Sequence, residues 1–239
     1  MPAAIAAALR NATLLFCKMT FTAKAILFDM DGVLIDSAPA VERVWRKWAL
    51  AHHLDPEAVI AQAHGRRSVE TIRAVAPHMD AERENLNVEQ MEIEDKEGVT
   101  ALPGALDLLR SLPCDRFAIV TSATTPLANA RLGYAGLPVP PSLVSADDVV
   151  DGKPSPEPYL KGAALLGVAP ADCIVFEDTP AGISSGHAAG MRVIALGNTY
   201  SARELQAADA LAGSLRDLAI SIRETSIVIE LKAVPASRD

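Results

Sequence analysis

Two aspartates that are separated by one residue and follow an apolar run are the residues of this chain best suited to chemistry. Residues 25–28 predict a short buried strand, and Asp29 and Asp31 come directly after it. Positions i and i+2 leave a strand on the same side, and ligands of open α/β sheets bind beyond the carboxyl ends of the strands. Two carboxylates in one such site can hold a divalent cation, attack phosphorus and transfer a proton. The structural alternative is a turn that the aspartate side chains stabilise.

A hydroxyl-rich turn follows the next strand-like segment of the expected sheet. Residues 117–120 are apolar, and Thr121, Ser122 and Ala123 come directly after them, ahead of an expected helix. Hydroxyl groups and the backbone N–H groups at a helix N-terminus bind phosphate oxygens. We therefore expect this turn to hold a phosphoryl group, although the same residues also suit a simple helix cap.

A lysine and an acidic pair complete the pattern. Lys153 lies in a proline-rich loop just before an expected helix, where the alternative is an ordinary solvated side chain. The apolar run 173–176 ends in Glu177 and Asp178, which suit either a helix cap or a metal site. Because several strand-like runs end in groups suited to phosphate or metal, their coincidence favours one shared site.

These four segments, in this order, resemble the motifs of the haloacid dehalogenase-like superfamily of phosphohydrolases, and of its subgroup with a helical cap inserted after the first motif. The resemblance extends from Lys24 to about Leu218. It implies an α/β fold with a doubly wound, Rossmann-like parallel sheet and an inserted α-helical cap domain. It also implies a phosphatase that forms an aspartyl-phosphate and uses Mg²⁺ as its cofactor.

The resemblance assigns a role to each residue of the four motifs. Asp29 is implied as the nucleophile and Asp31 as the general acid/base. Phosphoryl binding is implied for Thr121, Ser122, Ala123 and Lys153, of which Ser122 and Lys153 are also catalytic. Mg²⁺ binding is implied for Asp29, Asp178 and the backbone carbonyl of Asp31. Glu177 is implied either as a further Mg²⁺ ligand or as a residue that contacts the ligands. Mg²⁺ and the lysine ammonium would offset the repulsion between a carboxylate nucleophile and the phosphate anion.

The spacing of the motifs indicates an insertion. A βαβ unit needs about 30 residues, whereas Asp29 and Thr121 lie much further apart. The segment between them is rich in helix formers and has periodic apolar positions, including Val41, Val44 and Trp45. The later alternation of strands and helices indicates a doubly wound sheet, and residues 227–231 predict a further short strand. The predicted division is an N-terminal extension at 1–19, a Rossmann-like core domain at 20–37 and 101–239, and a helical cap domain at 38–100.

Composition and charge narrow the classes of partner. The 239 residues are 50% hydrophobic, carry a formal charge of −8 and contain no basic block. Nucleic acids and anionic membrane surfaces are therefore not expected as partners. The three cysteines are widely spaced and show neither a CxxC nor a zinc pattern, as is usual in a reducing compartment. We expect a cytoplasmic enzyme that is a monomer or a weak homodimer.

The expected substrate is a small phosphorylated sugar or polyol, because residues 64–68 are similar to the cap segment of sugar and polyol phosphatases. Arg67 is the candidate contact for substrate oxygens, and a solvated side chain is the alternative. Phosphomutases of the β-phosphoglucomutase type share the four motifs but have a histidine where this chain places Val41. A phosphoglycolate phosphatase would need an additional cation, for which Arg67 is the candidate. A dehalogenase would not need Asp31, and a non-catalytic protein on this fold would not need intact motifs.

Overall fold

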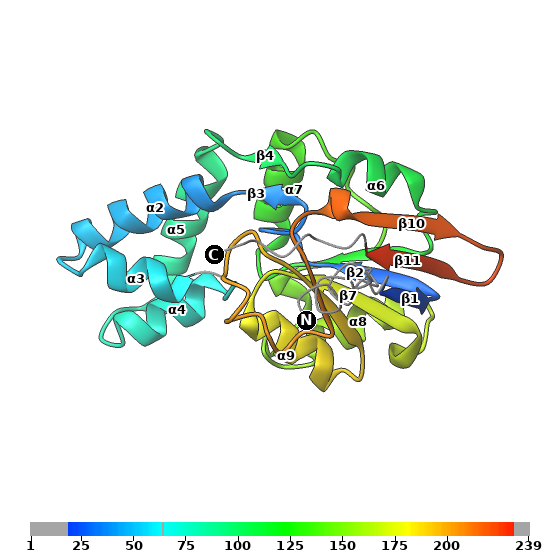
Figure 1. Cartoon of the computed structure of the whole chain (residues 1–239). Coiled ribbons are helices and arrows are strands. Elements are labelled where there is room, and N and C mark those ends of the chain that lie inside the picture. Colours follow the sequence, from blue (N-terminus) through cyan, green and yellow to red (C-terminus); the bar gives the residue numbers. More distant parts are fainter. Residues whose placement is uncertain (1–18, 64, 232–239) are drawn as a thin grey trace, which may run out of the picture.

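A parallel sheet forms the centre of the molecule. The computed structural model describes residues 19–63 and 65–231, so the predicted extension at 1–19 lies outside the described residues except for Met19 (Figure 1). The sheet has six strands in the order β6-β5-β2-β7-β8-β9, all parallel. Its strands are β2 (Ala25–Phe28), β5 (Phe117–Val120), β6 (Leu143–Val144), β7 (Cys173–Glu177), β8 (Arg192–Leu196) and β9 (Ala210–Ala212). The predicted doubly wound α/β fold is confirmed.

Helices cover both faces of this sheet because its strands are apolar on both sides. The helices are α6 (Ala105–Ser111) and α7 (Thr125–Tyr134) on one face, and α8 (Glu157–Leu165) and α9 (Pro180–Ala188) on the other (Figure 1). Along β2, Phe28 packs in the same core as Leu132 of α7, whereas Leu27 packs in the core that contains Tyr159 of α8. Three short 3₁₀ helices lie at Ala146–Asp148, Pro170–Asp172 and Leu215–Asp217.

A second, antiparallel sheet joins the two ends of the described chain. Its strands are β1 (Thr20–Ala23), β11 (Ile227–Leu231) and β10 (Leu218–Ile222), in that order. Ile227 and Ile229 are fully buried in the core that also contains Phe28. The predicted strand at 227–231 is confirmed, whereas its pairing with residues 20–23 requires a contact between distant segments that the sequence pattern does not reveal.

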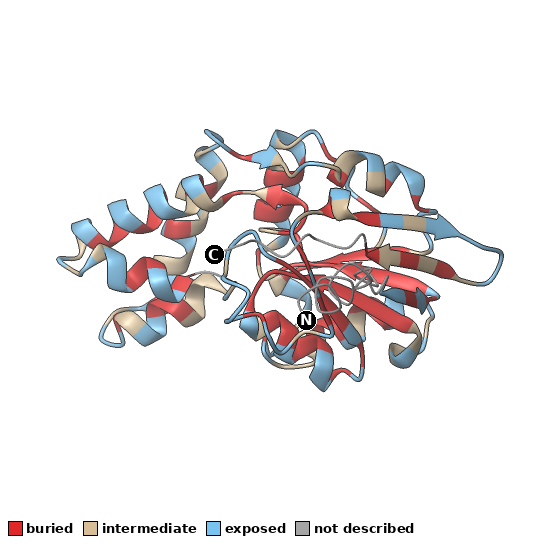
Figure 2. Cartoon of the chain, in the orientation of Figure 1, coloured by how far each residue is buried: buried red, intermediate tan, exposed pale blue. Residues whose placement is uncertain are grey.

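Four helices form a separate layer beyond the carboxyl ends of the central strands (Figure 1). They are α2 (Ala38–Ala51), α3 (Pro56–Ala63), α4 (Ser68–Val75) and α5 (Ala81–Glu94), and we call them the helical segment. It has its own apolar core, which includes Trp45, Trp48 and Ile72. Figure 2 shows that buried residues face the inside of this segment and exposed residues its outside. Within the residues that the structure describes, no helix is both long enough and apolar enough to cross a membrane.

A short pair of strands connects the helical segment to the rest of the molecule. β3 (Ile35–Asp36) leads into α2, and β4 (Thr100–Ala101) receives the chain after α5. The two strands pair antiparallel. The helical segment therefore has both of its connections at one place. All four helices fall within the range predicted for a cap, and the division into domains at residues 38 and 100 stays a prediction.

Two glycines on helices of the core show how closely each helix approaches its neighbours. A Cβ atom at Gly162 of α8 would lie 2.9 Å from Cγ2 of Val120 and 3.3 Å from Cδ2 of Leu27. A Cβ atom at Gly133 of α7 would meet no heavy atom within 4 Å. Gly162 therefore allows α8 to lie directly on the central sheet.

We expect opposite effects on stability from alanine at these two positions. Gly133→Ala should raise the free energy of unfolding by up to about 1 kcal/mol, because alanine favours an exposed helix position. Gly162→Ala should lower it by about 1–2 kcal/mol, because the added methyl group crowds a packed interior. Urea denaturation of both variants measures the difference. A Gly162→Ala protein as stable as the Gly133→Ala protein would contradict the close packing of α8.

Candidate active site

The central strands bring the polar residues of the four motifs to one edge of the sheet. β2 lies between β5 and β7 and runs parallel to both, so Asp29, Thr121 and Asp178 follow the carboxyl ends of neighbouring strands. A cavity of about 650 Å³ opens there between the sheet and the helical segment. Its walls include these three residues from the sheet and Val41 and Trp45 from α2. This is the position at which open α/β sheets bind ligands.

Lys153 lies at the base of the site and joins residues from three strand ends. Its Nζ donates hydrogen bonds to Asp29, to Oε1 of Glu177 at 2.6 Å and to the backbone carbonyl of Val120 at 3.3 Å. The side chain is only 2% exposed. Burial alone would lower the pKa of Lys153, but the carboxylates of Asp29 and Glu177 outweigh it and raise that pKa. A permanently charged ammonium therefore sits among buried carboxylates.

Every oxygen of the Glu177 carboxylate has hydrogen-bond donors. Oε1 accepts from Lys153 and from the Tyr159 hydroxyl at 2.9 Å. Oε2 accepts from the backbone N–H groups of Asp178 and Thr179 and from the Thr179 hydroxyl. Burial would raise the pKa of Glu177, but Lys153 and these hydrogen bonds outweigh it and lower that pKa. In this arrangement Glu177 fixes Lys153 and the turn after β7, and it stays within reach of a shared cation.

Asp178 has an oxygen that is free to bind a cation. Its Oδ2 accepts a hydrogen bond from the Thr199 hydroxyl, whereas Oδ1 is buried and has no hydrogen-bond partner among the described residues. One carboxylate oxygen each from Asp29, Glu177 and Asp178 lie within 4.8 Å of one another. Burial raises the pKa of Asp178 well above its usual value, and the neighbouring carboxylates raise it further. A divalent cation would satisfy the partnerless oxygen and offset this repulsion.

A close approach of backbone and carboxylate supports the same arrangement. Gly32 has a positive φ of 79°, and a Cβ atom there would lie 1.9 Å from Oδ2 of Asp178. No other residue fits at this position, because a side chain would both strain the backbone and displace the carboxylate. The glycine that follows Asp31 therefore allows the first and fourth motifs to come together.

Asp29 is a second carboxyl group whose pKa is raised by its surroundings. Burial raises its pKa to about 7, Lys153 opposes this effect, and the charge of Glu177 adds to it. In the cation-free protein this carboxyl group therefore binds a proton at a pH where it would be ionised in the unfolded chain. A bound cation would favour its charged form.

The Asp31 carboxylate is held from two sides by residues for which sequence analysis gave no role. Its Oδ1 accepts a hydrogen bond from the Ser37 hydroxyl at 2.6 Å, and its Oδ2 accepts one from Nη1 of Arg131 at 2.8 Å. Nη2 of Arg131 lies 3.4 Å from Oε2 of Glu92 in α5. The sequence does contain one signal for Arg131, because it is the only charged residue between positions 117 and 146.

The hydroxyl-rich turn lines the cavity, with its polar groups partly engaged in hydrogen bonds. The backbone N–H of Ala123 donates to the Thr121 hydroxyl at 3.1 Å, and the Ser122 hydroxyl donates to the backbone carbonyl of Gly65 at 3.2 Å. All three residues of the turn belong to the cavity wall. The contact of Ser122 with Gly65 connects the turn to the loop between α3 and α4.

Of the two neighbouring arginines, Arg66 and not Arg67 lines this cavity. Arg67 borders a smaller pocket of about 140 Å³, and its guanidinium binds Glu70 and the backbone carbonyl of Val150. It precedes α4 as the N-cap residue and pairs with Glu70 three positions later. The sequence expectation that Arg67 reaches the substrate is therefore not supported by its position.

Comparisons with known proteins identify the family of the chain. The sequence model of the haloacid dehalogenase-like hydrolases matches residues 23–190. The chain is 44% identical over 211 residues to hexitol phosphatase A of Escherichia coli, and the alignment covers 86% of this chain and 98% of that protein. It is 37% identical over 195 residues to glycerol-1-phosphate phosphohydrolase 2 of Saccharomyces cerevisiae, with coverage of 76% and 78%.

A solved structure shares the fold. The structure of a hydrolase from Pseudomonas syringae superposes with a TM-score of 0.73 at 24% sequence identity, and the match covers 80% of this chain and 94% of that chain. At this level of identity the likeness establishes the arrangement of strands and helices. The site has to be argued from its residues.

We expect a divalent cation to stabilise the protein more at high pH than at low pH. Between about pH 4 and pH 7 the cation-free folded state binds more protons than the unfolded chain, because the pKa of Asp29 is raised to about 7. Its stability therefore falls as the pH rises, while cation binding requires ionised carboxylates. Thermal unfolding with and without MgCl₂ should show a stabilisation of about 2.7 kcal/mol at about 100 times Kd near pH 8, and much less near pH 5.

Asp178→Asn provides the control, because it removes a charge from the carboxylate cluster and leaves the shape of the side chain. The cation should stabilise this variant little at either pH. An equal cation effect in the variant and the original protein would mean that the cation binds elsewhere.

Proposed function

The chain belongs to the haloacid dehalogenase-like hydrolase family, and we propose that it is a Mg²⁺-dependent phosphomonoester hydrolase for small sugar or polyol phosphates. The observation that carries this proposal is the buried Lys153 paired with Asp29, beside an Asp178 oxygen that has no partner among the described residues. Such a site neutralises an anionic substrate around a carboxylate nucleophile. The named relatives act on hexitol phosphates and glycerol 1-phosphate.

The proposed reaction has two steps that use the two aspartates differently. The Asp29 carboxylate attacks phosphorus and forms an aspartyl-phosphate, while Asp31 gives a proton to the departing alcohol. Asp31 then takes a proton from the water that hydrolyses this intermediate. Asp29, Asp178 and the backbone carbonyl of Asp31 would hold Mg²⁺, which would supply positive charge to offset the charge of the phosphoryl oxygens.

Other residues bind the phosphoryl group or compensate the charge of Asp29. Lys153 stays protonated and compensates the charge of Asp29, and Glu177 keeps its ammonium in place. Glu177 belongs to the same carboxylate cluster, so we propose that it either binds the cation directly or contacts the residues that do. The turn formed by Thr121, Ser122 and Ala123 offers hydroxyl and N–H donors to the phosphoryl oxygens.

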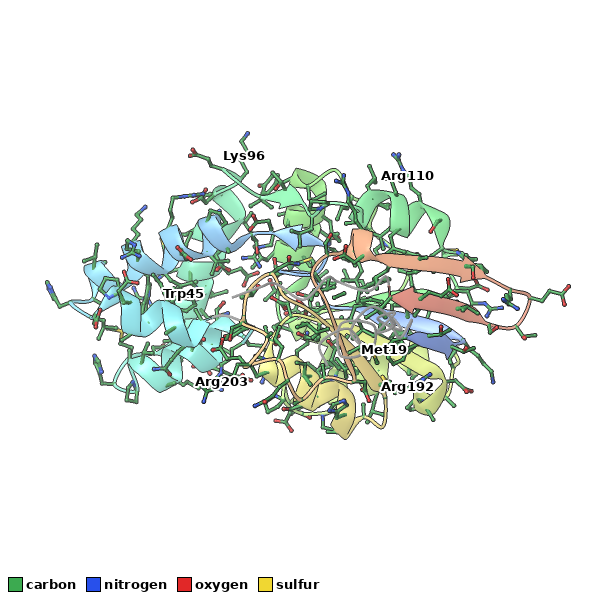
Figure 3. All side chains as sticks on the ribbon, in the orientation of Figure 1. Met19, Trp45, Lys96, Arg110, Arg192 and Arg203 are labelled. Atoms are coloured by element: carbon green, nitrogen blue, oxygen red, sulfur yellow. The ribbon has the colours of Figure 1, made fainter. Side chains whose placement is uncertain are left out.

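The cavity wall favours a neutral polyhydroxy leaving group. Glu42 and Glu204 line it, and their carboxylates would accept hydrogen bonds from hydroxyl groups and repel a second anionic group. Trp45 lines the same cavity from the helical segment, in which Figure 3 labels it. Arg66 takes the place of Arg67 as the candidate contact for substrate oxygens.

The same wall argues against the mutase alternative. Val41 lines the cavity at the position where, by the resemblance noted above, a mutase has a histidine. An apolar side chain cannot exchange a proton with a sugar hydroxyl. Water is therefore the proposed final acceptor of the phosphoryl group.

We expect Asp29→Asn to abolish turnover and to leave the fold intact, because an amide is a poor nucleophile of nearly the same shape. Phosphate release from glycerol phosphate in the presence of MgCl₂ measures turnover, and circular dichroism checks the fold. Asp107→Asn is the matched control, since Asp107 is an exposed aspartate on α6. Full activity of Asp29→Asn would exclude the covalent mechanism.

Substrate preference is tested with a panel of glycerol phosphates, hexitol and hexose phosphates, 2-deoxyglucose 6-phosphate, phosphoglycolate and β-glucose 1-phosphate. The carboxylates of Glu42 and Glu204 would repel the carboxylate of phosphoglycolate. We therefore expect kcat/KM for phosphoglycolate to be at least about tenfold below that for the best polyol phosphate, a difference of about 1.4 kcal/mol. Preference for phosphoglycolate would contradict this interpretation of the cavity. Conversion of β-glucose 1-phosphate to glucose 6-phosphate without phosphate release would favour the mutase.

A further inference from the structure

The buried ion pair between Arg131 and Glu92 has no place in the four motifs. Arg131 comes from the last turn of α7 and Glu92 from the last turns of α5, so the pair joins the sheet layer to the helical segment. Their side chains are only 7% and 5% exposed. Burial raises the pKa of Glu92, and the guanidinium of Arg131 opposes this effect. Two desolvated charged groups are a costly way to hold two helices together, since apolar residues would pack as well.

The second arm of the Arg131 guanidinium reaches the reaction site. Nη1 donates to Oδ2 of Asp31 at 2.8 Å, so that one planar cation binds both Asp31 and Glu92. Arginine can make two such contacts at once because its donors form a rigid fork. Glu92 therefore fixes the rotation of the guanidinium, and the guanidinium fixes the Asp31 carboxylate.

Ser37 completes this arrangement from the opposite side. It occupies the N-cap position of α2 but makes no side-chain capping hydrogen bond. Its hydroxyl donates instead to Oδ1 of Asp31 at 2.6 Å. A serine at this position usually caps the helix through its side chain, whereas here the hydroxyl is directed to Asp31.

Ser37 and Glu92, which hold Asp31 directly and through Arg131, both lie close to the strands that connect the helical segment to the sheet. Ser37 directly follows β3, and Glu92 lies near the end of α5, just before the chain returns through β4. The paired strands β3 and β4 are the connection about which the helical segment would move. The orientation of Asp31 therefore depends on residues at the outgoing and returning ends of this connection.

We propose that Arg131 is a positioning residue that Glu92 holds in place. Together with Ser37, Arg131 orients the Asp31 carboxyl group, which gives its proton to the leaving group. This inference rests on the proposed function and goes beyond the four motifs. Arg131 acts through Asp31 and takes no part itself in bond making. Its removal should therefore impair the step that needs a well-placed proton donor more than the steps that do not.

Two substrates separate these steps. The alkoxide that leaves a polyol phosphate needs a proton, whereas p-nitrophenolate leaves p-nitrophenyl phosphate as a stable anion. In Arg131→Met we expect kcat for the best polyol phosphate of the panel to fall by about 100-fold or more. The rate of the first p-nitrophenolate release, measured by rapid mixing with MgCl₂, should fall less than about tenfold.

Additional variants keep the test independent of folding. Arg131→Lys keeps a buried positive charge but cannot bind both carboxylates in the planar geometry of arginine, so it should show the same substrate split in a milder form. Arg110→Met is the control, because Arg110 is an exposed arginine on α6 that extends away from the protein in Figure 3. It should leave both rates unchanged.

The outcomes distinguish this inference from the proposed function. Equal losses with the two substrates in both Arg131 variants, or a change confined to KM, would overturn the positioning role of Arg131. An original protein that releases phosphate from neither substrate would overturn the proposed function itself. A polyol-specific loss of kcat in a folded Arg131→Lys protein would support the inference.

Discussion

The structure of the site depends on one buried lysine ammonium among three carboxylates. Lys153 binds Asp29 and Glu177 directly, and Asp178 lies in the same cluster. Without this positive charge, burial and mutual repulsion would drive protons onto the carboxylates. With it, Glu177 stays ionised and organises the turn after β7, while one Asp178 oxygen has no partner among the described residues. The negative charge of the three carboxylates exceeds the positive charge of Lys153, so a divalent cation would balance the cluster and help it to bind a phosphate.

The helical segment lines part of the cavity and contacts the sheet layer through polar groups and through Ala40 and Ile93, which pack in or against the core of the sheet. The Ser122 hydroxyl binds the carbonyl of Gly65, and Arg131 binds Glu92. The apolar cores of the sheet and of the helical segment are separate clusters. A largely separate apolar core allows two bodies to move relative to each other more readily than one shared core does. Opening of the cavity to substrate and its closure against water would therefore change the contacts between the helical segment and the sheet layer.

Much of the fold is predictable from local patterns because its strands are short, apolar on both faces and followed by polar turns. The strands at 25–28, 117–120 and 173–177 and the helices after them agree with the sequence analysis. The helical nature of the inserted segment also follows from its periodic apolar residues. The antiparallel sheet that joins residues 20–23 to 227–231 does not, since strand pairing over such a separation leaves no mark in either segment.

The sequence by itself determined the candidate chemistry, because the types and order of Asp29, Asp31, Lys153 and Asp178 are sufficient to indicate phosphate and metal. Tertiary structure alone decided how these groups are held. Arg131 meets Asp31 across 100 positions of the chain, a contact that only the packing of α7 beside β2 creates. Which of two adjacent arginines faces the cavity was likewise settled by the start of α4, since side-chain direction follows backbone geometry that residue types do not specify.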